Sequence, residues 1–416
     1  MNQVSASAML HWTEHDTPHS ARWQSENGQL PPKRVVVADD TLSADTAWRL
    51  ACEGTALLWR GDYHNARQLL QAMARRASRK PRKEAEKVAA KVAAKAAGKA
   101  VHKIKVPDLR FPEAFHLHRM AQAQRARTLG MLLIPVEVGG LIPLRRAPDV
   151  AEALSAAFGA AGSAARVDVQ GNEQADLLQA PFVLSLRELL GLIGAHEWRR
   201  QGVLVPALGA RIHPHYGVFS PLRGEYLDLI ARARLPATSL AFDIGTGTGV
   251  IAALLAQAGV QRVLATENSP RALACARENL GRLGLDACVE VLEADLFPPG
   301  RAPLVVCNPP WVPAKPSSAV EQAVYDADSR MLRGFLDGLA AHLEEGGEGW
   351  LILSDLAEHL GLRSREQLLG WIEAAGLQVL GRDEVRPRHS KAGDETDPLH
   401  KARAAEVTSL WRLGVR

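Results

Sequence analysis

Residues 239–259, SLAFDIGTGTGVIAALLAQAG, restrict the possible folds of this chain more than any other stretch. An apolar run of strand length leads into alternating glycines and threonines, and an apolar segment long enough for a helix follows. Glycine permits a tight turn and lets a ligand come close to the backbone, here at the start of a helix. The stretch therefore predicts a strand, a ligand-facing loop and a helix.

Strands and helices continue to alternate after this loop. QRVLATENSPRALACARENLGRLG predicts a strand, a turn and a helix. Further strands are predicted in CVEVLEADLF, APLVVCNPPW, GEGWLILSD, LQVLGRDEV and EVTSLWRLGV, and further helices at 323–343 and in SREQLLGWIEAAG. Such alternation indicates a parallel sheet with crossover helices.

The glycine loop differs from that of dinucleotide dehydrogenases. It consists of Gly245, Thr246, Gly247, Thr248 and Gly249. Val250 stands where a GxGxxG loop has its last glycine. Asp243 lies two residues before the loop, where an anion would repel a pyrophosphate and attract a cationic ligand. Both features disfavour a nicotinamide enzyme.

FDIGTGTGVIA resembles motif I of the class I S-adenosylmethionine-dependent methyltransferases. The resemblance implies a Rossmann-like α/β domain with seven strands, the last one antiparallel, that binds S-adenosyl-L-methionine. It implies that Asp243 orders the loop, which passes close to the cofactor. It also implies that Glu267, at the end of the next strand, binds both ribose hydroxyls, and that Asp295 lies near the adenine amino group.

A buried strand stops at Asn308, which Pro309, Pro310 and Trp311 follow. The four residues match the Asn-Pro-Pro-aromatic motif of methyltransferases that act on a planar nitrogen, either a base amino group or a glutamine amide. The resemblance implies that the Asn308 side chain, beside the cofactor, and the Pro309 carbonyl accept the two hydrogens of the target nitrogen. The prolines hold these acceptors rigidly, and Trp311 stacks on the planar substrate.

The segment HPHYGVFSPLRGEYLDLI, before the first strand, is similar to the entry segment that closes over cofactor and substrate in such enzymes. Its substrate-side candidates are Tyr216, Phe219, Pro221 and Arg223. It departs from the Pro-Arg-Pro-x-Thr-Glu sequence of the release-factor glutamine methyltransferases. This departure disfavours a protein-glutamine target.

The first half of the chain contains no glycine-rich loop and is predicted to be a smaller α/β accessory domain. We expect a loose N-terminus at 1–30, a helical part at 31–76 and the remainder of this domain at 107–210, with the methyltransferase domain at 211–416. Two helices, broken near Gly61, are predicted within 46–76. Residues 77–106 form a basic linker or helix rich in lysine and alanine.

Positive charge is concentrated in one segment. Residues 75–105 hold twelve Lys or Arg against Glu84 and Glu86, so the rest of the chain is net negative. Lysines recur every four residues within the part from Lys87 to Lys105, which favours binding to phosphates through counterion release. A solvated tether explains the same pattern equally well.

Composition narrows the remaining possibilities. Four scattered cysteines without a CxxC pair suit a reducing cytoplasm and disfavour a zinc site or a disulfide framework. The two His-x-His pairs lack an obvious third ligand, so we expect no metal. No apolar run reaches membrane-spanning length, so we expect no membrane partner.

Three hypotheses about function follow. The preferred substrate is RNA, specifically ribosomal RNA, methylated at an exocyclic base nitrogen, because ribosomal guanine-amino methyltransferases have a similar catalytic half behind a non-catalytic domain. The alternative is a protein glutamine-amide methyltransferase acting on a translation factor or ribosomal protein. The third is a catalytically inactive RNA-binding or assembly factor.

Overall fold

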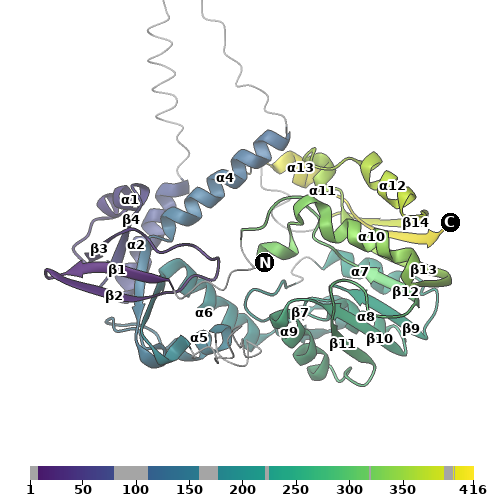
Figure 1. Ribbon diagram of the computed structural model, residues 1–416, viewed down its shortest axis with the longest axis horizontal. Helices are drawn as coiled ribbons and strands as arrows, with labels where there is room; N and C mark the ends of the chain where they lie inside the picture. The colour runs from purple at the N-terminus through teal and green to yellow at the C-terminus, as the bar shows by residue number, and fades with distance from the viewer. Residues whose placement is uncertain are drawn as a thin grey trace, which may run out of the picture. The chain divides into compact units, whose positions relative to one another are not determined.

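The computed structural model describes residues 8–78, 111–158, 177–220, 224–317, 320–387, 397 and 399–416 (Figure 1). The chain divides into two compact units. The first consists of 1–151 and 178–191, and the second of 152–177 and 192–416. The basic segment falls almost entirely at 79–110, outside the described residues.

The first unit is built on a six-stranded mixed sheet with the order β1-β2-β6-β5-β4-β3. Its strands are β1 (Met9–Glu14), β2 (Thr17–Trp23), β3 (Arg34–Ala38), β4 (Thr55–Trp59), β5 (Leu132–Val136) and β6 (Phe182–Ser185). Its helices are α1 (Ala44–Cys52), α2 (Tyr63–Ser78) and α4 (Phe111–Leu129), while α5 (Ala151–Phe158) and α6 (Leu186–Gln201) cross the boundary between the units. The predicted smaller α/β domain is confirmed.

Two expectations for this unit were wrong. Within the segment expected to be loose, residues 9–23 form the antiparallel hairpin β1–β2, which the fully buried Leu10 anchors to the sheet. The segment expected to be helical holds α1 and α2, but also β3 and β4. The sequence of β4, TALLW, is buried throughout, so it has no period that distinguishes a strand from a helix.

The second unit contains a seven-stranded sheet with the order β11-β10-β9-β12-β13-β15-β14. Its strands are β9 (Leu240–Ile244), β10 (Arg262–Glu267), β11 (Val289–Glu293), β12 (Ala302–Cys307), β13 (Leu343–Ser354), β14 (Leu377–Val385) and β15 (Thr408–Val415). The first five are parallel, and β15 pairs antiparallel with both β13 and β14. This confirms the predicted sheet, including the antiparallel direction of the last strand.

Helices cover both faces of this sheet. They are α7 (Glu225–Arg232), α8 (Val250–Gln257), α9 (Pro270–Arg282), α10 (Arg330–His342), α11 (Leu356–His359), α12 (Arg365–Ala374) and α13 (His400–Ala405). Alternate strand residues separate two cores: Ala241 and Val263 pack with residues of α7, α8 and α9, while Phe242 and Leu264 pack with residues of α10 and α12. This alternation places Asp243 on the first face, together with Ala265 of β10 and Val306 of β12, with which it is in register.

Shorter elements complete the chain. The hairpin β7 (Val203–Val205) and β8 (Ala210–Ile212) belongs to the second unit, so that unit begins earlier than the expected boundary at 211. One-turn helices lie at Val138–Gly140, Leu177–Gln179, Pro206–Leu208, Val320–Ala323 and Ala327–Ser329. Among the described residues, no helix has both the length and the apolar character needed to cross a membrane.

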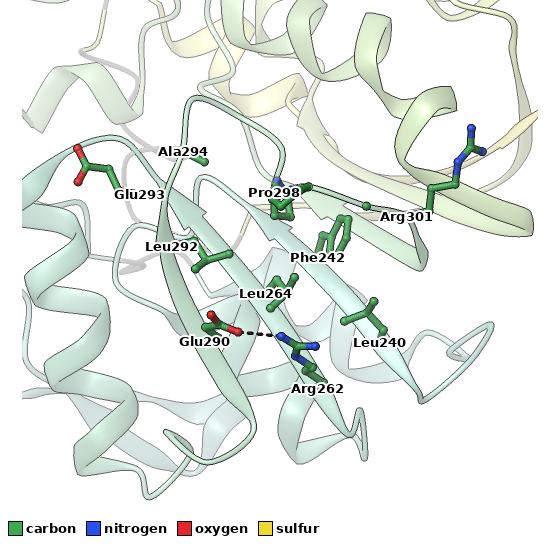
Figure 2. A pocket seen from close by; sticks show the side chains of 12 residues that line it. Leu240, Phe242, Arg262, Leu264, Glu290, Leu292, Glu293, Ala294, Pro298 and Arg301 are labelled. Carbon is green, nitrogen blue, oxygen red and sulfur yellow. Dashed lines mark hydrogen bonds and ion pairs between the residues drawn. The ribbon is translucent and has the colours of Figure 1, made fainter.

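The connection from β11 to β12 contains no helix among its residues 294–301, and a cavity of about 530 Å³ lies against the sheet there. Leu240, Phe242, Leu264 and Leu292 line it, beside the 2.9 Å ion pair of Arg262 with Glu290 (Figure 2). None of the residues predicted to bind cofactor or substrate lines this cavity.

Candidate active site

The carboxyl ends of four parallel strands bring the main predicted residues together. Asp243 of β9 pairs in register with Ala265 of β10 and Val306 of β12. The glycine loop, Glu267 and Asn308 therefore begin within about two residues of one another along the same sheet edge. Open α/β sheets bind ligands at this edge, where neighbouring strand ends leave a crevice.

The glycine loop turns the chain from β9 into α8. Gly245, Gly247 and Gly249 have φ values of 71°, 57° and 83°, a region that residues with a Cβ rarely adopt. A Cβ on Gly249 would also lie 3.3 Å from the Leu280 side chain, so the close approach of α9 favours glycine there. The Thr246 amide donates to the Thr266 carbonyl at 2.9 Å, which ties the loop to the end of β10.

Asp243 orders this loop from inside the protein. Its Oδ2 accepts hydrogen bonds from the Thr246 hydroxyl at 2.6 Å and from the Ala252 amide, in the first turn of α8, at 3.0 Å. The side chain is buried, and its Oδ1 forms no hydrogen bond. Burial raises the pKa of this carboxyl to about 7, against the pull of its two hydrogen bonds. The free buried oxygen fits a ligand that brings a cationic or N–H group to the loop.

Glu267 is held by backbone donors. Its Oε1 accepts from the amides of Asn268 and Ser269 at 2.9 and 3.1 Å, and its Oε2 accepts from Gly247 at 3.2 Å. A carboxylate has about four acceptor positions, so these bonds fix its orientation and occupy most of them. A ribose bound through both hydroxyls would replace the Gly247 bond, the longest of the three. With that exchange the residue fits the predicted role.

The other predicted residues differ in exposure and contacts, and two of them lie outside the described residues. Asp295 follows β11 at the same sheet edge, but its side chain is exposed and reaches Arg330 of α10 at 3.5 Å. The Tyr216 ring lies 5.6 Å from the guanidinium of Arg271 in the first turn of α9. Phe219 is half-buried, whereas Pro221 and Arg223 lie outside the described residues.

The Asn308–Trp311 segment is joined by an internal hydrogen bond. Trp311 Nε1 donates to Asn308 Oδ1 at 2.8 Å. Pro309 is buried, while Asn308, Pro310 and Trp311 are half-buried. The indole packs against apolar residues of both cores, so the ring predicted to stack on a substrate is turned inward.

Tyr226 of α7 belongs to this site, and sequence analysis did not single it out. It is buried, and its ring lies 6.2 Å from that of Trp311 at an interplanar angle of 88°. Burial raises the pKa of its hydroxyl, and the Asn308 side chain opposes that rise. Its spacing in α7 marks only a buried helical position, and no local signal distinguishes it from a core residue.

Asn279 of α9 is a second such residue. It is buried, its Nδ2 donates to the Thr248 carbonyl at 3.0 Å, and its Oδ1 accepts from the His213 amide at 2.7 Å. One side chain therefore links the glycine loop to the segment that enters the site. An asparagine among apolar positions of an amphipathic helix was the available signal.

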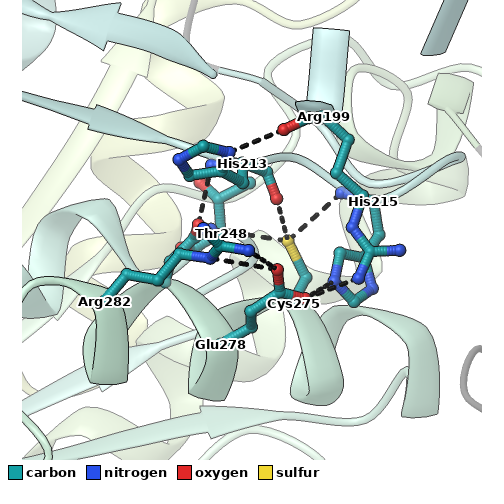
Figure 3. A network of polar contacts seen from close by, with 8 residues as sticks. Arg199, His213, His215, Thr248, Cys275, Glu278 and Arg282 are labelled. Carbon is teal, nitrogen blue, oxygen red and sulfur yellow. Dashed lines mark hydrogen bonds and ion pairs between the residues drawn. The ribbon is translucent and has the colours of Figure 1, made fainter. Parts of the chain in front are cut away.

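A polar network surrounds that link (Figure 3). Glu278 of α9 accepts from Arg199 at 2.6 Å and from Arg282 at 2.9 Å, and lies 2.7 Å from His215 Nε2. These partners lower the pKa of Glu278 to about 2 in spite of its partial burial. His213 Nδ1 lies 2.6 Å from the Arg199 carbonyl. His213 thus fastens the entry segment to α6, and His215 fastens it to α9.

Within the described residues, no three His, Cys, Asp or Glu side chains are arranged to hold a metal ion.

We predict that Asn279→Ala destabilises the second unit by about 2 to 4 kcal/mol, because it leaves the His213 amide and the Thr248 carbonyl unpaired in a buried place. Hydrogen exchange of the His213 amide measures this directly. Asn279→Asp keeps the acceptor and should protect that amide more than the alanine does. The exposed Asn268→Ala is the control, and equal protection in Asn279→Ala and this control would contradict the prediction.

Comparison with known proteins locates the similarity in the second unit. Residues 210–362 match the family model described as the methyltransferase small domain. A release factor glutamine methyltransferase from Cereibacter sphaeroides is 32% identical over 169 residues, covering 37% of this chain and 58% of that protein. A ribosomal protein L11 methyltransferase from Sorangium cellulosum is 32% identical over 116 residues, covering 28% of this chain and 31% of that protein.

Solved structures are more distant. A ribosomal protein L11 methylase from Lactobacillus delbrueckii subsp. bulgaricus is 17% identical, with a TM-score of 0.33 over 46% of this chain and 78% of that one. The chain spans about half the length of the first relatives that it matches. The sequence match and the strand order together give the second unit the class I methyltransferase fold.

Proposed function

We propose that this protein is an S-adenosylmethionine-dependent N-methyltransferase that acts on a planar amide nitrogen of a protein, a glutamine side chain of a translation factor or a ribosomal protein. The observation that carries the proposal is the Asn308–Trp311 segment at the end of β12, next to the loop that Asp243 orders. Relatives named as release factor glutamine methyltransferases support the protein substrate.

Different residues of the site would bind the cofactor and the target amide. S-adenosylmethionine, when bound, supplies a methyl group on an electrophilic sulfonium. Asp243 and the glycine loop would hold its cationic part, and Glu267 its ribose. An amide nitrogen is a weak nucleophile because its lone pair is delocalised. Asn308 Oδ1 and the Pro309 carbonyl would accept its two hydrogens and hold the nitrogen in the orientation needed for attack.

The ribosomal RNA hypothesis has less support. Several relatives are named as methyltransferases of a protein, the release factor, and not of RNA. The entry segment lacks the Pro-Arg-Pro-x-Thr-Glu sequence of the release-factor enzymes. We therefore infer a glutamine-amide target from the other observations and do not assign the protein that carries it.

The test is transfer of tritium from labelled S-adenosylmethionine into lysate of a strain that lacks this protein. One portion of the labelled lysate is then treated with ribonuclease and another with protease. We expect loss of macromolecular label with protease alone. Loss with ribonuclease alone would overturn the protein substrate and restore the RNA hypothesis, and no transfer above the Asn308→Ala background would contradict the enzyme.

Cofactor affinity should depend on the charge of Asp243. Burial raises its pKa to about 7, and a cationic ligand favours the ionised form. Affinity for S-adenosylmethionine should therefore fall as pH drops below about 7, by up to about tenfold per unit, and binding at pH 6 should release a proton. Calorimetry in two buffers of different ionisation enthalpy measures that proton. Proton-neutral binding at pH 6 would contradict the prediction.

The same carboxyl should make the ligand-free protein less stable as pH rises, whereas it should strengthen cofactor binding. The folded state holds the Asp243 proton more tightly than the unfolded chain, whose aspartate has an ordinary pKa. Ligand-free stability should therefore decrease as pH rises from about 4 to about 7, by at most ~1.4 kcal/mol per unit, with the full loss present above pH 7.

A further inference from the structure

We propose that Trp311 and Tyr226 are positioning residues that determine which end of the Asn308 side-chain amide faces the target nitrogen. The inference rests on the proposed function and deepens it. Its starting point is that the Asn308 side chain accepts a hydrogen bond from Trp311 of its own loop, whose indole packs edge to face against Tyr226 of α7.

The two ends of an asparagine amide have nearly the same size, so hydrogen bonds alone decide its orientation. The indole N–H of tryptophan is a donor only. Trp311 Nε1, 2.8 Å from Asn308 Oδ1, therefore selects the orientation with the oxygen on its side. A carbonyl oxygen has two lone pairs, so one remains for a hydrogen of the target.

Tyr226 acts on Asn308 through the indole. Burial raises the pKa of Tyr226, so the phenol stays neutral. The Tyr226 ring also meets the Trp311 ring edge to face, and so fixes the indole that fixes the amide.

The orientation matters because the target is an NH₂ group. A flipped Asn308 would point its own N–H bonds at the N–H bonds of the target and could not accept a hydrogen from it. A phenylalanine at position 311 would fill similar space but would provide no N–H to prevent this flip. The indole N–H therefore orients the Asn308 amide, a role that stacking on a substrate would not require.

The test replaces Trp311 in the full chain with 3-(3-benzothienyl)alanine, an isostere in which sulfur takes the place of the N–H. We expect turnover to fall by about 10- to 100-fold, with the KM of the protein substrate and the affinity for S-adenosylmethionine within twofold. Tyr226→Leu, which removes the edge-to-face ring contact with Trp311, should act in the same direction. In an Asn308→Ala background the isostere should not reduce turnover further, because the effects of residues that act through one group are not additive.

A second measurement does not depend on turnover. The side-chain amide protons of Asn308, identified by their absence in Asn308→Asp, should exchange slowly in the natural protein and faster in the isostere variant. The same isostere at Trp198, a tryptophan 49% exposed on α6, is the control and should change neither readout.

The outcomes separate the two proposals. Unchanged turnover and unchanged amide exchange in the isostere, together with a higher substrate KM in Trp311→Ala, would assign Trp311 to stacking and overturn the inference. The natural protein would then still methylate its target. Failure of the natural protein to transfer label to protein would instead overturn the proposed function, while amide exchange would still report whether Trp311 orients Asn308.

Discussion

Asn308→Ala should reduce turnover by about 100- to 1,000-fold and leave the affinity for S-adenosylmethionine nearly unchanged. The variant removes the side-chain acceptor for the target nitrogen, and losing one preoriented polar group at a reacting centre has an effect of this size. It leaves Asp243, the glycine loop and Glu267 intact. Steady-state transfer assays and calorimetric cofactor binding measure the two quantities.

The matched control is Asn27→Ala, an exposed asparagine of the first unit, which should behave like the natural protein. Near-normal turnover of Asn308→Ala would refute its role as the acceptor. A parallel loss of cofactor affinity would mean that Asn308 acts mainly on the cofactor side.

Asp243→Ala should weaken binding of S-adenosylmethionine by about 100-fold or more. The change removes a buried negative charge and the two hydrogen bonds that hold Thr246 and the start of α8 in place. A hydrogen bond to a charged group contributes about 1.5–3 kcal/mol, and each 1.4 kcal/mol is a factor of ten in affinity. Calorimetric titration at pH 8, where the natural carboxyl is ionised, gives the full difference.

Asp243→Asn separates charge from loop order. It retains an oxygen for Ala252 or Thr246 but removes the charge, so its affinity should be reduced and independent of pH between 6 and 8. Unchanged affinity in both variants would contradict the assignment of this loop to the cofactor. Loss of folding in Asp243→Ala would leave the asparagine variant as the informative one.

The second unit was predictable because its signals are local. A glycine loop between an apolar strand and a helix, and two prolines after another strand, each set the backbone over a few residues. Because the strands are parallel, their carboxyl ends lie at one edge of the sheet, so the residues that follow them are predicted to lie close together. Position along the sheet does not follow from chain order, because β12 lies beside β9 and not beside β11.

The first half was harder because its strands have no distinguishing period. The β4 run TALLW is buried on every side, and the hairpin of residues 9–23 looks polar because most of its side chains are exposed. Only pairing with distant strands decides that these segments are strands, and pairing is not visible locally.

Contacts between distant residues were missed for the same reason. Tyr226 lies 82 positions before Asn308, and Asn279 meets Thr248 and His213 across 31 and 66 positions. Neither side chain stands in a motif. The packing of Trp311 likewise involves Tyr226 of α7, whose ring lies 6.2 Å from the indole, and the predicted stacking role remains a prediction.

The most direct test of the central claim is the chemical position of the transferred methyl group. Protein labelled with tritium from S-adenosylmethionine is hydrolysed in acid, which cleaves side-chain amides but leaves methylated amines intact. Release of the label as volatile methylamine is the predicted result, because the methyl group would sit on an amide nitrogen. Label that stays on an amino acid, or that is found only in RNA, would contradict the account.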